Sequence, residues 1–388
     1  MKTVLVIDSC QFSANYNYCL LDALAKRGLS VAYATTEFAH GYMPDPERVE
    51  VLRCFFFLAR LAARVTSRRL VRRLFRAVEY PVDWAWLLVY IMAKHIKVVH
   101  FMWAVSPWLD YRVMRFLRVV GRKVVYTAHN PFPHEQKEGD ARKYSKIYLT
   151  ADRIITLTQY SKDEIVKRCG VSGDKIAVIP HGDYSPIFGR YAINESLASA
   201  VRQKAAGRKI IAFLGHIRPY KGVEFFIESF ALIEKRLPRP FFLIAGSLLV
   251  GNKEQLELKL AESCSPDSLW ADIRFLPVED LKAYLSVIDV LVQPYVSASQ
   301  SGNTAMAYAA SVPVVSTNVG GLAEMTEDGQ TGYVIPPANP EAIAEAVAKC
   351  FEGGNYAKLS QNARQAADSR FGWSTIAEQT ARVYEGLF

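Results

Sequence analysis

The 388-residue sequence predicts an α/β protein made of two domains, each a doubly wound parallel sheet. Three observations lead to this fold class. The length suits two domains, because one domain usually has about 100–200 residues. Hydrophobic residues make up 51% of the chain and charged residues 22%, which excludes a disordered or fibrous protein. Short apolar runs alternate with helical patterns, and most runs are continuously apolar, as expected for strands covered on both faces.

Six strands are predicted in the first half, each from a short run of apolar and β-branched residues. A helical pattern follows the first of them at residues 17–27. Parallel strands need a crossover between them, usually a helix, so this alternation indicates a parallel sheet. The six runs occupy residues 3–8, 31–35, 98–103, 124–129, 153–158 and 176–180.

The second half has the same organisation, with helices predicted at residues 223–235 and 340–351. Residues 183–207 lack a clear strand and end in a polar, glycine-containing stretch, so they are the predicted linker. We therefore place a first domain at residues 1–190 and a second at residues 191–371. The strands of the second half are predicted at residues 210–215, 241–246, 273–276, 290–294, 313–317 and 332–335.

The formal charge of +9 is unevenly distributed. Residues 1–190 hold 29 basic and 17 acidic residues, a net charge of +12, and the remainder has a net charge of −3. An acidic partner is therefore expected on the first domain. The longest uncharged apolar stretches have ten residues, whereas a membrane-spanning helix needs about 20, and no signal peptide is recognised. Six scattered cysteines without zinc spacing indicate a reduced cytosolic protein with no structural metal.

One loop has the composition of a phosphate site. Gly215-His-Ile-Arg-Pro-Tyr-Lys-Gly222 follows a predicted strand and opens a helix. Gly215 and Gly222 allow a close backbone approach, the helix start offers free N–H groups, and Arg218 and Lys221 supply positive charge. This combination suits a diphosphate, although it is neither a Walker loop nor a Gly-x-Gly-x-x-Gly fingerprint. An ordinary strand–helix turn explains the same residues equally well.

Four histidines stand at or just after a predicted strand end, namely His129, His134, His181 and His216. A single histidine is more often structural than functional. In doubly wound sheets, however, ligands bind beyond the carboxyl ends of the strands. We therefore expect the four to meet in a cleft between two facing sheets.

Several motifs together resemble the retaining GT-B glycosyltransferases of family 4. In the second half they lie at residues 213–222, 313–324 and 329–336, and in the first half, more loosely, at 127–130, 151–156 and 178–182. The resemblance implies two facing Rossmann-like domains with an interdomain cleft. It also implies a nucleotide-sugar donor, held mainly by the second domain, and an acceptor that enters from the first. Residues 372–388 look like the family's closing helix, which packs back on the first domain.

The resemblance assigns roles to residues of this sequence. Arg218 and Lys221 match the positions that neutralise the donor diphosphate, so no metal ion and no cofactor are expected. His129 matches the histidine that contacts the transferred sugar. With Arg218, Lys221 and His129 as catalytic candidates, the donor-binding candidates are Gly215, His216, Ser301, Gly302, Asn303, Thr304, Glu324, Pro277 and His181.

The sequence departs from the family in two places. The family usually carries two glutamates, which contact the sugar hydroxyls and the ribose, and Ala298 and Met306 stand at these positions. Ser299, Gln300, Ser301 and Asn303 are candidates for the first role. Residues 8–15 lack the paired glycines that commonly follow the first strand, so a bulkier loop is expected on the acceptor side.

The basic charge of the first half is concentrated in residues 48–76, which contain nine arginines and one acid. Five of the arginines recur every four residues, at 60, 64, 68, 72 and 76, and leucines, valines and aromatic residues surround them. This pattern is typical of a basic amphipathic helix in a membrane interface, here within residues 53–90. A solvated helix whose apolar side covers the sheet is the structural alternative. Nucleic acid is a further alternative, but no nucleic-acid module is recognised.

The family resemblance and the basic segment together predict a retaining glycosyltransferase, cytosolic and peripheral on the inner face of the cell membrane. Its acceptor is expected to be a membrane-associated, lipid-linked saccharide, in polysaccharide or glycolipid synthesis, and no nucleic-acid partner is expected. A non-catalytic nucleotide-sugar-binding protein, a GT-B sugar-nucleotide epimerase and a phosphorylase remain alternatives.

Overall fold

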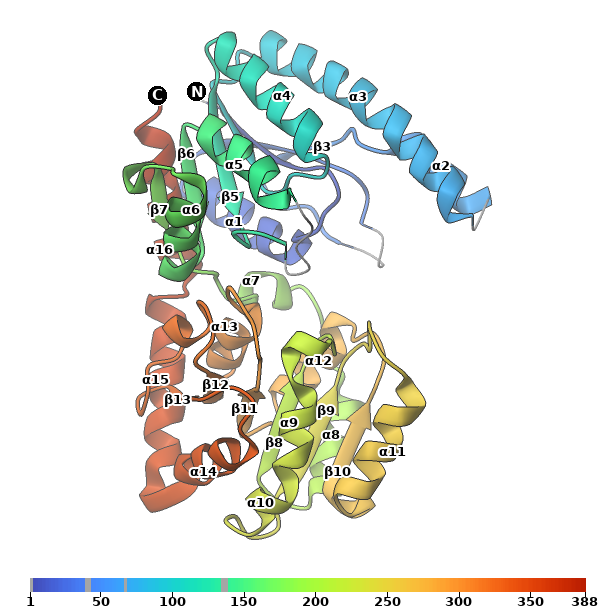
Figure 1. Ribbon diagram of the computed structural model, residues 1–388, viewed down its shortest axis with the longest axis vertical. Helices are drawn as coiled ribbons and strands as arrows, with labels where there is room; N and C mark the ends of the chain where they lie inside the picture. Colours follow the sequence, from blue (N-terminus) through green and yellow to red (C-terminus); the bar gives the residue numbers. More distant parts are fainter. Residues whose placement is uncertain (1–2, 39–42, 66–67, 134–138) are drawn as a thin grey trace. The chain divides into compact units, whose positions relative to one another are not determined.

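The computed structural model describes residues 3–38, 43–65, 68–133 and 139–388, and the chain forms two compact units (Figure 1). One unit extends to Pro180 and includes the C-terminal Trp373–Phe388, and the other is His181–Gly372. The break after Pro180 comes before the boundary placed at residue 190. The predicted fold class, two doubly wound parallel sheets with flanking helices, is confirmed.

The first unit has a parallel sheet in the order β3-β2-β1-β4-β5-β6-β7. Each of the six predicted runs contains a strand, but the expectation of six strands was wrong, because β3 is a seventh. β3 is a half-exposed edge strand that begins and ends with charged residues, so it has no apolar run. The strands are β1 (Thr3–Asp8), β2 (Ser30–Thr35), β3 (Glu50–Arg53), β4 (Val98–Phe101), β5 (Lys123–Ala128), β6 (Arg153–Thr156) and β7 (Ile176–Val178).

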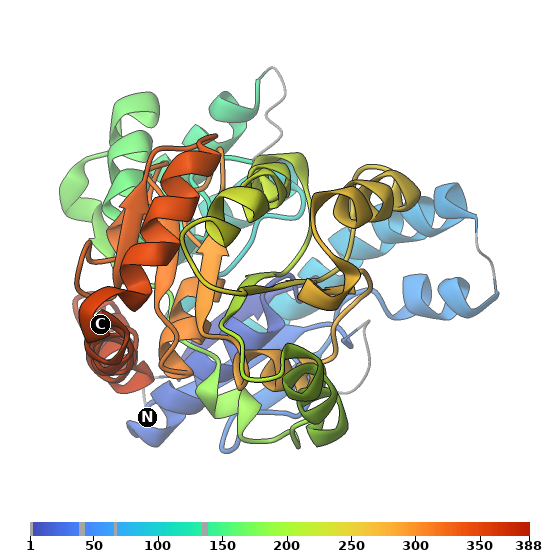
Figure 2. The same ribbon diagram turned by 90° about the horizontal axis from the view of Figure 1, so that it is seen from below.

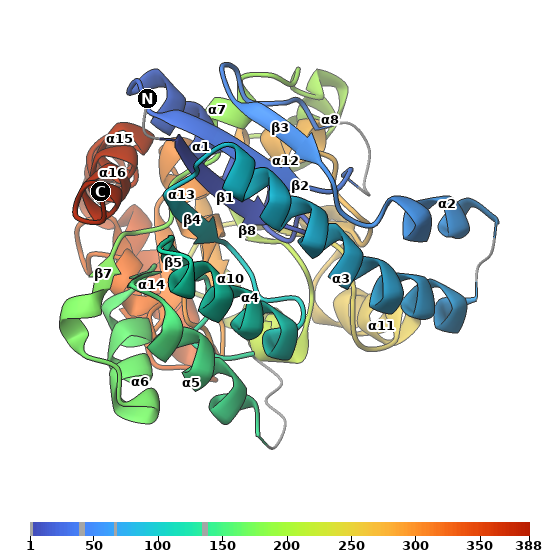
Figure 3. The same ribbon diagram turned by 90° about the horizontal axis from the view of Figure 1, so that it is seen from above.

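Helices cover this sheet, and α4, α5 and α6 lie side by side (Figure 3). The C-terminal helix α16 packs on α1. A buried histidine of β4 helps to hold α16, because His100 Nδ1 lies 2.6 Å from the Tyr384 hydroxyl and Nε2 lies 2.7 Å from Thr127 Oγ1. The helices are α1 (Ala14–Lys26), α2 (Phe57–Val65), α3 (Arg69–Ala93), α4 (Pro107–Val119), α5 (Asp140–Thr150), α6 (Gln159–Cys169) and α16 (Trp373–Glu385).

The second unit has a parallel sheet in the order β10-β9-β8-β11-β12-β13, and α14 packs on β11, β12 and β13 (Figure 2). Alternate residues of β8 enter separate apolar clusters, Ile211 and Phe213 in one and Ile210, Ala212 and Leu214 in the other. Both faces are therefore covered. The strands are β8 (Ile210–Leu214), β9 (Phe241–Ala245), β10 (Leu269–Asp272), β11 (Val290–Gln293), β12 (Val314–Thr317) and β13 (Gly332–Ile335).

Two predictions for this unit were wrong. The strand expected at residues 273–276 lies earlier, at β10, an edge strand with little burial. The helix expected at residues 223–235 is divided at Ser229 into α9 (Val223–Glu228) and α10 (Phe230–Glu234). The predicted linker contains α7 (Ser185–Phe188) and α8 (Glu195–Ala205), whose Asn194 cap accepts a hydrogen bond from the Leu197 N–H. The other helices are α11 (Lys253–Ser263), α12 (Val278–Leu285), α13 (Gly302–Ala309), α14 (Pro340–Phe351) and α15 (Asn355–Ser369).

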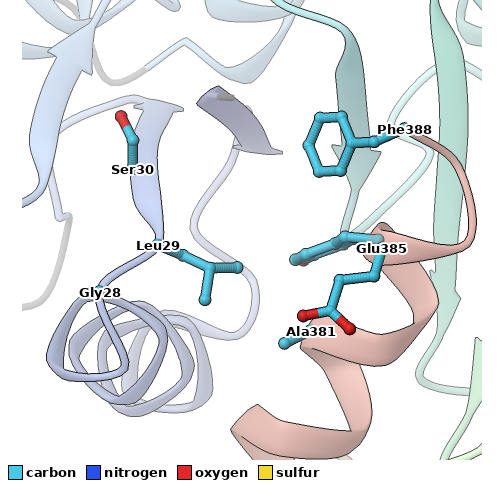
Figure 4. A pocket seen from close by; sticks show the side chains of 7 residues that line it. Gly28, Leu29, Ser30, Ala381, Glu385 and Phe388 are labelled. Carbon is cyan, nitrogen blue, oxygen red and sulfur yellow. The ribbon is translucent and has the colours of Figure 1, made fainter. Parts of the chain in front are cut away.

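The strand order of each sheet identifies one position, at the carboxyl ends of its central strands, where a ligand is expected. The chain winds from β1 to β2 on one side and from β4 to β5 on the other, and β8 and β11 play the same parts in the second unit. Ligands of doubly wound sheets bind beyond the carboxyl ends of the strands at this change of direction. A cavity of about 290 Å³ between α16 and the start of β2 lies at the opposite end of its sheet (Figure 4).

Candidate functional site

The loop after β8 is shaped by glycines that accept left-handed backbone angles. Gly215 has φ +113° and Gly222 has φ +62°. A Cβ atom at Gly222 would lie 2.1 Å from the Pro294 carbonyl oxygen, so only glycine lets this loop close on the end of β11. A Cβ atom at Gly215 would lie 2.9 Å from Asn303 Nδ2, which donates to the Leu214 carbonyl at 2.7 Å. The loop and the start of α13 are therefore in direct contact.

A tyrosine positions the lysine of this loop. Lys221 Nζ donates to the Tyr295 hydroxyl at 2.7 Å and lies 4.1 Å from the centre of the same ring. Within the part of the chain that the structure describes, Lys221 forms no ion pair with a carboxylate. Its charge therefore faces a neutral hydroxyl and a π system, and it is available to an anion. Arg218, half-buried, precedes the short 3₁₀ turn Pro219–Lys221.

Buried hydrogen bonds fix the start of α13. Gln293, at the end of β11, donates from Nε2 to Ser301 Oγ at 3.0 Å and accepts from Thr304 Oγ1 at 2.8 Å. The Tyr295 hydroxyl lies 3.5 Å from the same Ser301 Oγ. Lys221 is thus connected through Tyr295, Ser301 and Gln293 to the first turn of α13. Sequence reasoning missed Gln293 and Tyr295, although both stand at a predicted strand end.

His181 lies against the same helix start. A Cβ atom at Gly302 would lie 3.1 Å from His181 Cε1, so the imidazole and the backbone are in close contact. Nδ1 lies 2.6 Å from the Gly182 carbonyl oxygen, which can only accept, so Nδ1 carries the proton. Burial lowers the pKa of His181 to about 4, although this hydrogen bond acts in the opposite direction. The imidazole is therefore neutral at neutral pH.

The remaining candidates for binding the sugar donor are His216, Pro277 and Glu324. His216 is exposed on the loop after β8, and Pro277 caps α12, which follows β10. Glu324 belongs to a 3₁₀ turn after β12, and its carbonyl oxygen accepts a hydrogen bond from Arg370 at 2.6 Å. The structure therefore brings together the candidates after β8 and β11 with His181. Pro277 and Glu324 follow different strands.

The two positions of the missing glutamates are apolar and closed. Ala298 is 5% exposed and Met306 is 7% exposed, and each belongs to a hydrophobic cluster of the unit. The Ser301 N–H, at the turn between them, donates to Met325 Sδ at 3.3 Å. Apolar side chains thus stand where carboxylates were expected, and Ser301 lies between them in the chain.

His129 belongs to the first unit, directly after β5. It is 4% exposed and stacks on Trp103, with ring centres 4.8 Å apart and 6° between the planes. The ring of Tyr16 is nearly perpendicular to it, with ring centres 4.9 Å apart. His129 therefore sits between two aromatic rings that sequence reasoning missed. Trp103 comes two residues after the end of β4, the neighbour of β5, which is the signal that could have identified it. His134 lies outside the described residues.

The basic segment was expected to form one helix, but it forms two. Arg60 is on α2 and Arg76 is on α3, with residues 66–67 between the helices outside the description. One acidic residue of α3 joins the two helices, because Glu79 accepts the Leu58 and Ala59 N–H groups at 2.6 and 2.8 Å. Part of the expected aromatic flank is buried, namely Phe55, Phe56, Tyr80 and Trp84, so these residues pack in the core.

The outer side of this pair of helices is nevertheless apolar. Leu70, Leu74, Val78 and Val82 recur every four residues along α3, and each is at least 60% exposed. Arg68 and Arg73 are also exposed. Within the described residues, no helix is both long and apolar enough to cross a membrane. Further exposed apolar residues of the pair are Phe57, Leu58, Leu61, Trp86 and Val89.

Comparison with known proteins gives consistent matches. Residues 13–182 match the family described as Glycosyltransferase Family 4, and residues 208–352 match the one described as Glycosyl transferases group 1. A D-inositol 3-phosphate glycosyltransferase of Paenarthrobacter aurescens (strain TC1) is 26% identical over 279 residues. That match covers 70% of this chain and 65% of the relative, which is less than two thirds of the relative's length.

Solved structures are similar over the whole chain. The crystal structure of Anabaena HepE in complex with UDP covers 100% of both chains with a TM-score of 0.72 and 17% identity. WaaG, described as a glycosyltransferase involved in lipopolysaccharide biosynthesis, covers 99% of this chain and 100% of its own with a TM-score of 0.65 and 17% identity. At these identities the similarity establishes the fold.

Proposed function

The chain belongs to glycosyltransferase family 4 and has the GT-B fold, and from this premise we propose that it transfers a sugar from a nucleoside diphosphate sugar to an acceptor, with retention at the anomeric carbon. The observation that carries the proposal is the loop after β8, where Lys221 lies against two tyrosine rings and, within the described residues, forms no ion pair with a carboxylate. Relatives named as glycosyltransferases and the UDP complex of HepE support it.

The chemistry follows from the charge of the leaving group. When the bond to the sugar breaks, negative charge develops on the departing nucleoside diphosphate. We assign the stabilisation of this charge to Lys221 and Arg218, together with the N–H groups at the start of α13. These groups supply the positive charge that a divalent cation would otherwise provide, so we propose a metal-independent reaction. Hydroxyl and amide groups near Ser301 then take the place of the glutamates.

We also propose that the acceptor is a lipid-linked saccharide and that α2 and α3 bind an anionic membrane surface from the cytosolic side. An exposed apolar stripe beside arginines is the pattern of a helix that lies in a membrane interface. Each basic residue near an anionic surface contributes about 1 kcal/mol, so the exposed arginines add to the affinity of the apolar side chains.

A panel of UDP-, GDP- and dTDP-sugars tests the donor proposal. Slow release of the nucleoside diphosphate from one of them, without added acceptor, is the expected result. Release from none of them, in a protein that binds none, would contradict the proposal. One observation favours a second candidate, because Ala298 and Met306 remove both family glutamates. A donor that binds without any release would identify a non-catalytic nucleotide-sugar-binding protein instead.

Vesicle flotation tests the membrane proposal. The wild type should float with vesicles that contain phosphatidylglycerol and less with phosphatidylcholine vesicles. A variant with Leu70→Ser, Leu74→Ser and Val78→Ser should lose most of this binding. Leu258→Ser, at a residue of α11 that is 62% exposed, is the matched control and should bind normally. Equal flotation of the triple variant and the control would exclude α3 as the binding surface.

A further inference from the structure

The first unit has its own change of winding direction, between β1 and β4. These strands pair along their length, with Val4 opposite Val98 and Ile7 opposite Phe101. Beyond their carboxyl ends come the loop at residues 9–13 and the segment that begins with Met102. By the rule for doubly wound sheets, a ligand of this unit binds between these two segments.

The loop after β1 is rigidly built. The Asp8 carboxylate accepts the N–H groups of Cys10 and Phe12 at 3.3 Å and of Ser13 at 3.2 Å. Burial raises the pKa of Asp8, although these hydrogen bonds act in the opposite direction. Gln11 has φ +53°, an unfavourable angle for a residue with a side chain, and its Nε2 donates to the Thr36 carbonyl at 2.7 Å. Such strain persists only where surrounding contacts impose it.

This rigid loop presents an aromatic ring to solvent. Phe12 is 62% exposed and meets Trp103 edge to face, with ring centres 5.8 Å apart. Trp103 is half-buried and fixed in turn, because its Nε1 donates to Ser13 Oγ at 2.9 Å while its indole stacks on His129. A single exposed phenylalanine is ordinary on a protein surface. Here, however, two rings are held in place beside His129 at the position where a ligand is expected.

We propose that Phe12 and Trp103 form a platform on which an uncharged saccharide ring of the acceptor stacks. The inference rests on the proposed transfer of a sugar and specifies the class of acceptor. The face of an aromatic ring carries partial negative charge and attracts the weakly positive C–H groups on the apolar side of a pyranose. A phosphate group would need a cation instead, and residues 8–17, 102–110 and 128–133 contain no lysine or arginine.

A basic residue near the loop after β1 defines the competing possibility. Arg76 of α3 is close enough to Cys10 to act electrostatically on its thiol. It is exposed and lies outside residues 8–17, 102–110 and 128–133. A phosphorylated sugar bound through Arg76 would use that cation rather than the rings. The ring platform predicts that a neutral sugar binds more tightly than a phosphorylated one, whereas binding through Arg76 predicts the reverse order of affinity.

Saturation-transfer NMR of the full-length protein separates the two modes. The neutral probes are the methyl glycosides of glucose, galactose and mannose, and the charged probe is glucose 6-phosphate. We expect saturation of ring C–H protons in at least one methyl glycoside, with a dissociation constant about two- to tenfold larger in Phe12→Ala. Phe12→Tyr should restore binding. Phe116→Ala, which removes a ring of α4 that is 45% exposed, is the matched control and should bind normally.

Phe12 is largely exposed, so its replacement should not impair folding, and a UDP titration of the same samples reports on the second unit. The platform would be overturned if Phe12→Ala bound the methyl glycosides as tightly as the wild type does. It would also be overturned if the wild type bound glucose 6-phosphate more tightly than the methyl glycosides, or if it gave no saturation of any methyl glycoside. Absence of UDP, GDP and dTDP binding in the wild type would instead contradict the proposed donor.

Discussion

Replacing Lys221 with methionine should stop catalysis while leaving the fold intact. Methionine keeps most of the length and apolar area of the lysine stem and removes only the ammonium group. In the native protein that group donates to the Tyr295 hydroxyl at 2.7 Å and makes no ion pair with a described carboxylate. Its loss therefore breaks one hydrogen bond and leaves no buried acid without a partner.

The expected effect follows from Coulomb's law. Lys221 is half-buried, so an effective dielectric constant of about 20 is appropriate. A unit charge that develops about 4 Å from the ammonium group is then stabilised by about 4 kcal/mol. Since each 1.4 kcal/mol changes a rate tenfold, turnover should fall by roughly three orders of magnitude.

The assay is the rate of nucleoside diphosphate release from the donor that the wild type accepts. Lys235→Met, at an exposed lysine of the same unit, is the matched control and should keep the wild-type rate. Equal thermal stability of both variants would show that the fold is intact. A Lys221→Met rate within tenfold of the wild type would refute the electrostatic role of this loop.

Three further predictions concern single residues. Tyr295→Phe keeps the ring but loses the hydroxyl bonded to Lys221, so UDP titration should show affinity reduced by about tenfold, by roughly 1.5 kcal/mol. Gly222→Ala should lower the melting temperature by several degrees, because its Cβ would clash with Pro294. In His100→Gln the free energy of unfolding should fall less steeply than in the wild type as the pH is lowered below 6.5. Burial lowers the pKa of His100 to about 3 from 6.5, so its contribution is complete above pH 6.5 and declines below it. A decline as steep as in the wild type would contradict this.

The fold could be predicted because its strands are buried on both faces. Runs such as residues 210–214 and 241–245 are continuously apolar since both sides of the sheet are covered. Edge strands do not have this pattern, and β3 and β10 were accordingly missed or displaced. β10 ends at Asp272, whose carboxylate accepts a hydrogen bond from the Tyr284 hydroxyl at 2.6 Å. A hydrogen bond to a residue of a later helix leaves no pattern in the sequence around Asp272.

The candidate site was predictable where its residues belong to one local motif. Gly215, Arg218, Lys221 and Gly222 lie within eight residues, so their pattern is visible in the sequence. The groups that hold them come from other strands and could not be predicted from spacing. Tyr295 reaches Lys221 across 74 residues. Trp103 and His129 likewise meet only because β4 and β5 are neighbours in the sheet.

The basic segment shows a different limit of sequence patterns. The spacing of its arginines predicted one continuous helix, and the chain instead forms α2 and α3. Burial also divides its aromatic residues, because Tyr80 and Trp84 pack in the core while Trp86 is 51% exposed. Periodicity therefore identified an amphipathic region but not which apolar residues face solvent.

Thermal shift with UDP-, GDP- and dTDP-sugars tests the central claim most directly, because a ligand that binds only the folded protein raises its stability by about 2.7 kcal/mol at one hundred times its dissociation constant. The proposed donor site predicts that one of these nucleotide sugars raises the melting temperature of the wild type by several degrees. The same ligand should have a much smaller effect on Lys221→Met, and the free nucleoside should have little effect on either protein. An unchanged melting temperature with all three donors, or an equal shift in Lys221→Met, would contradict it.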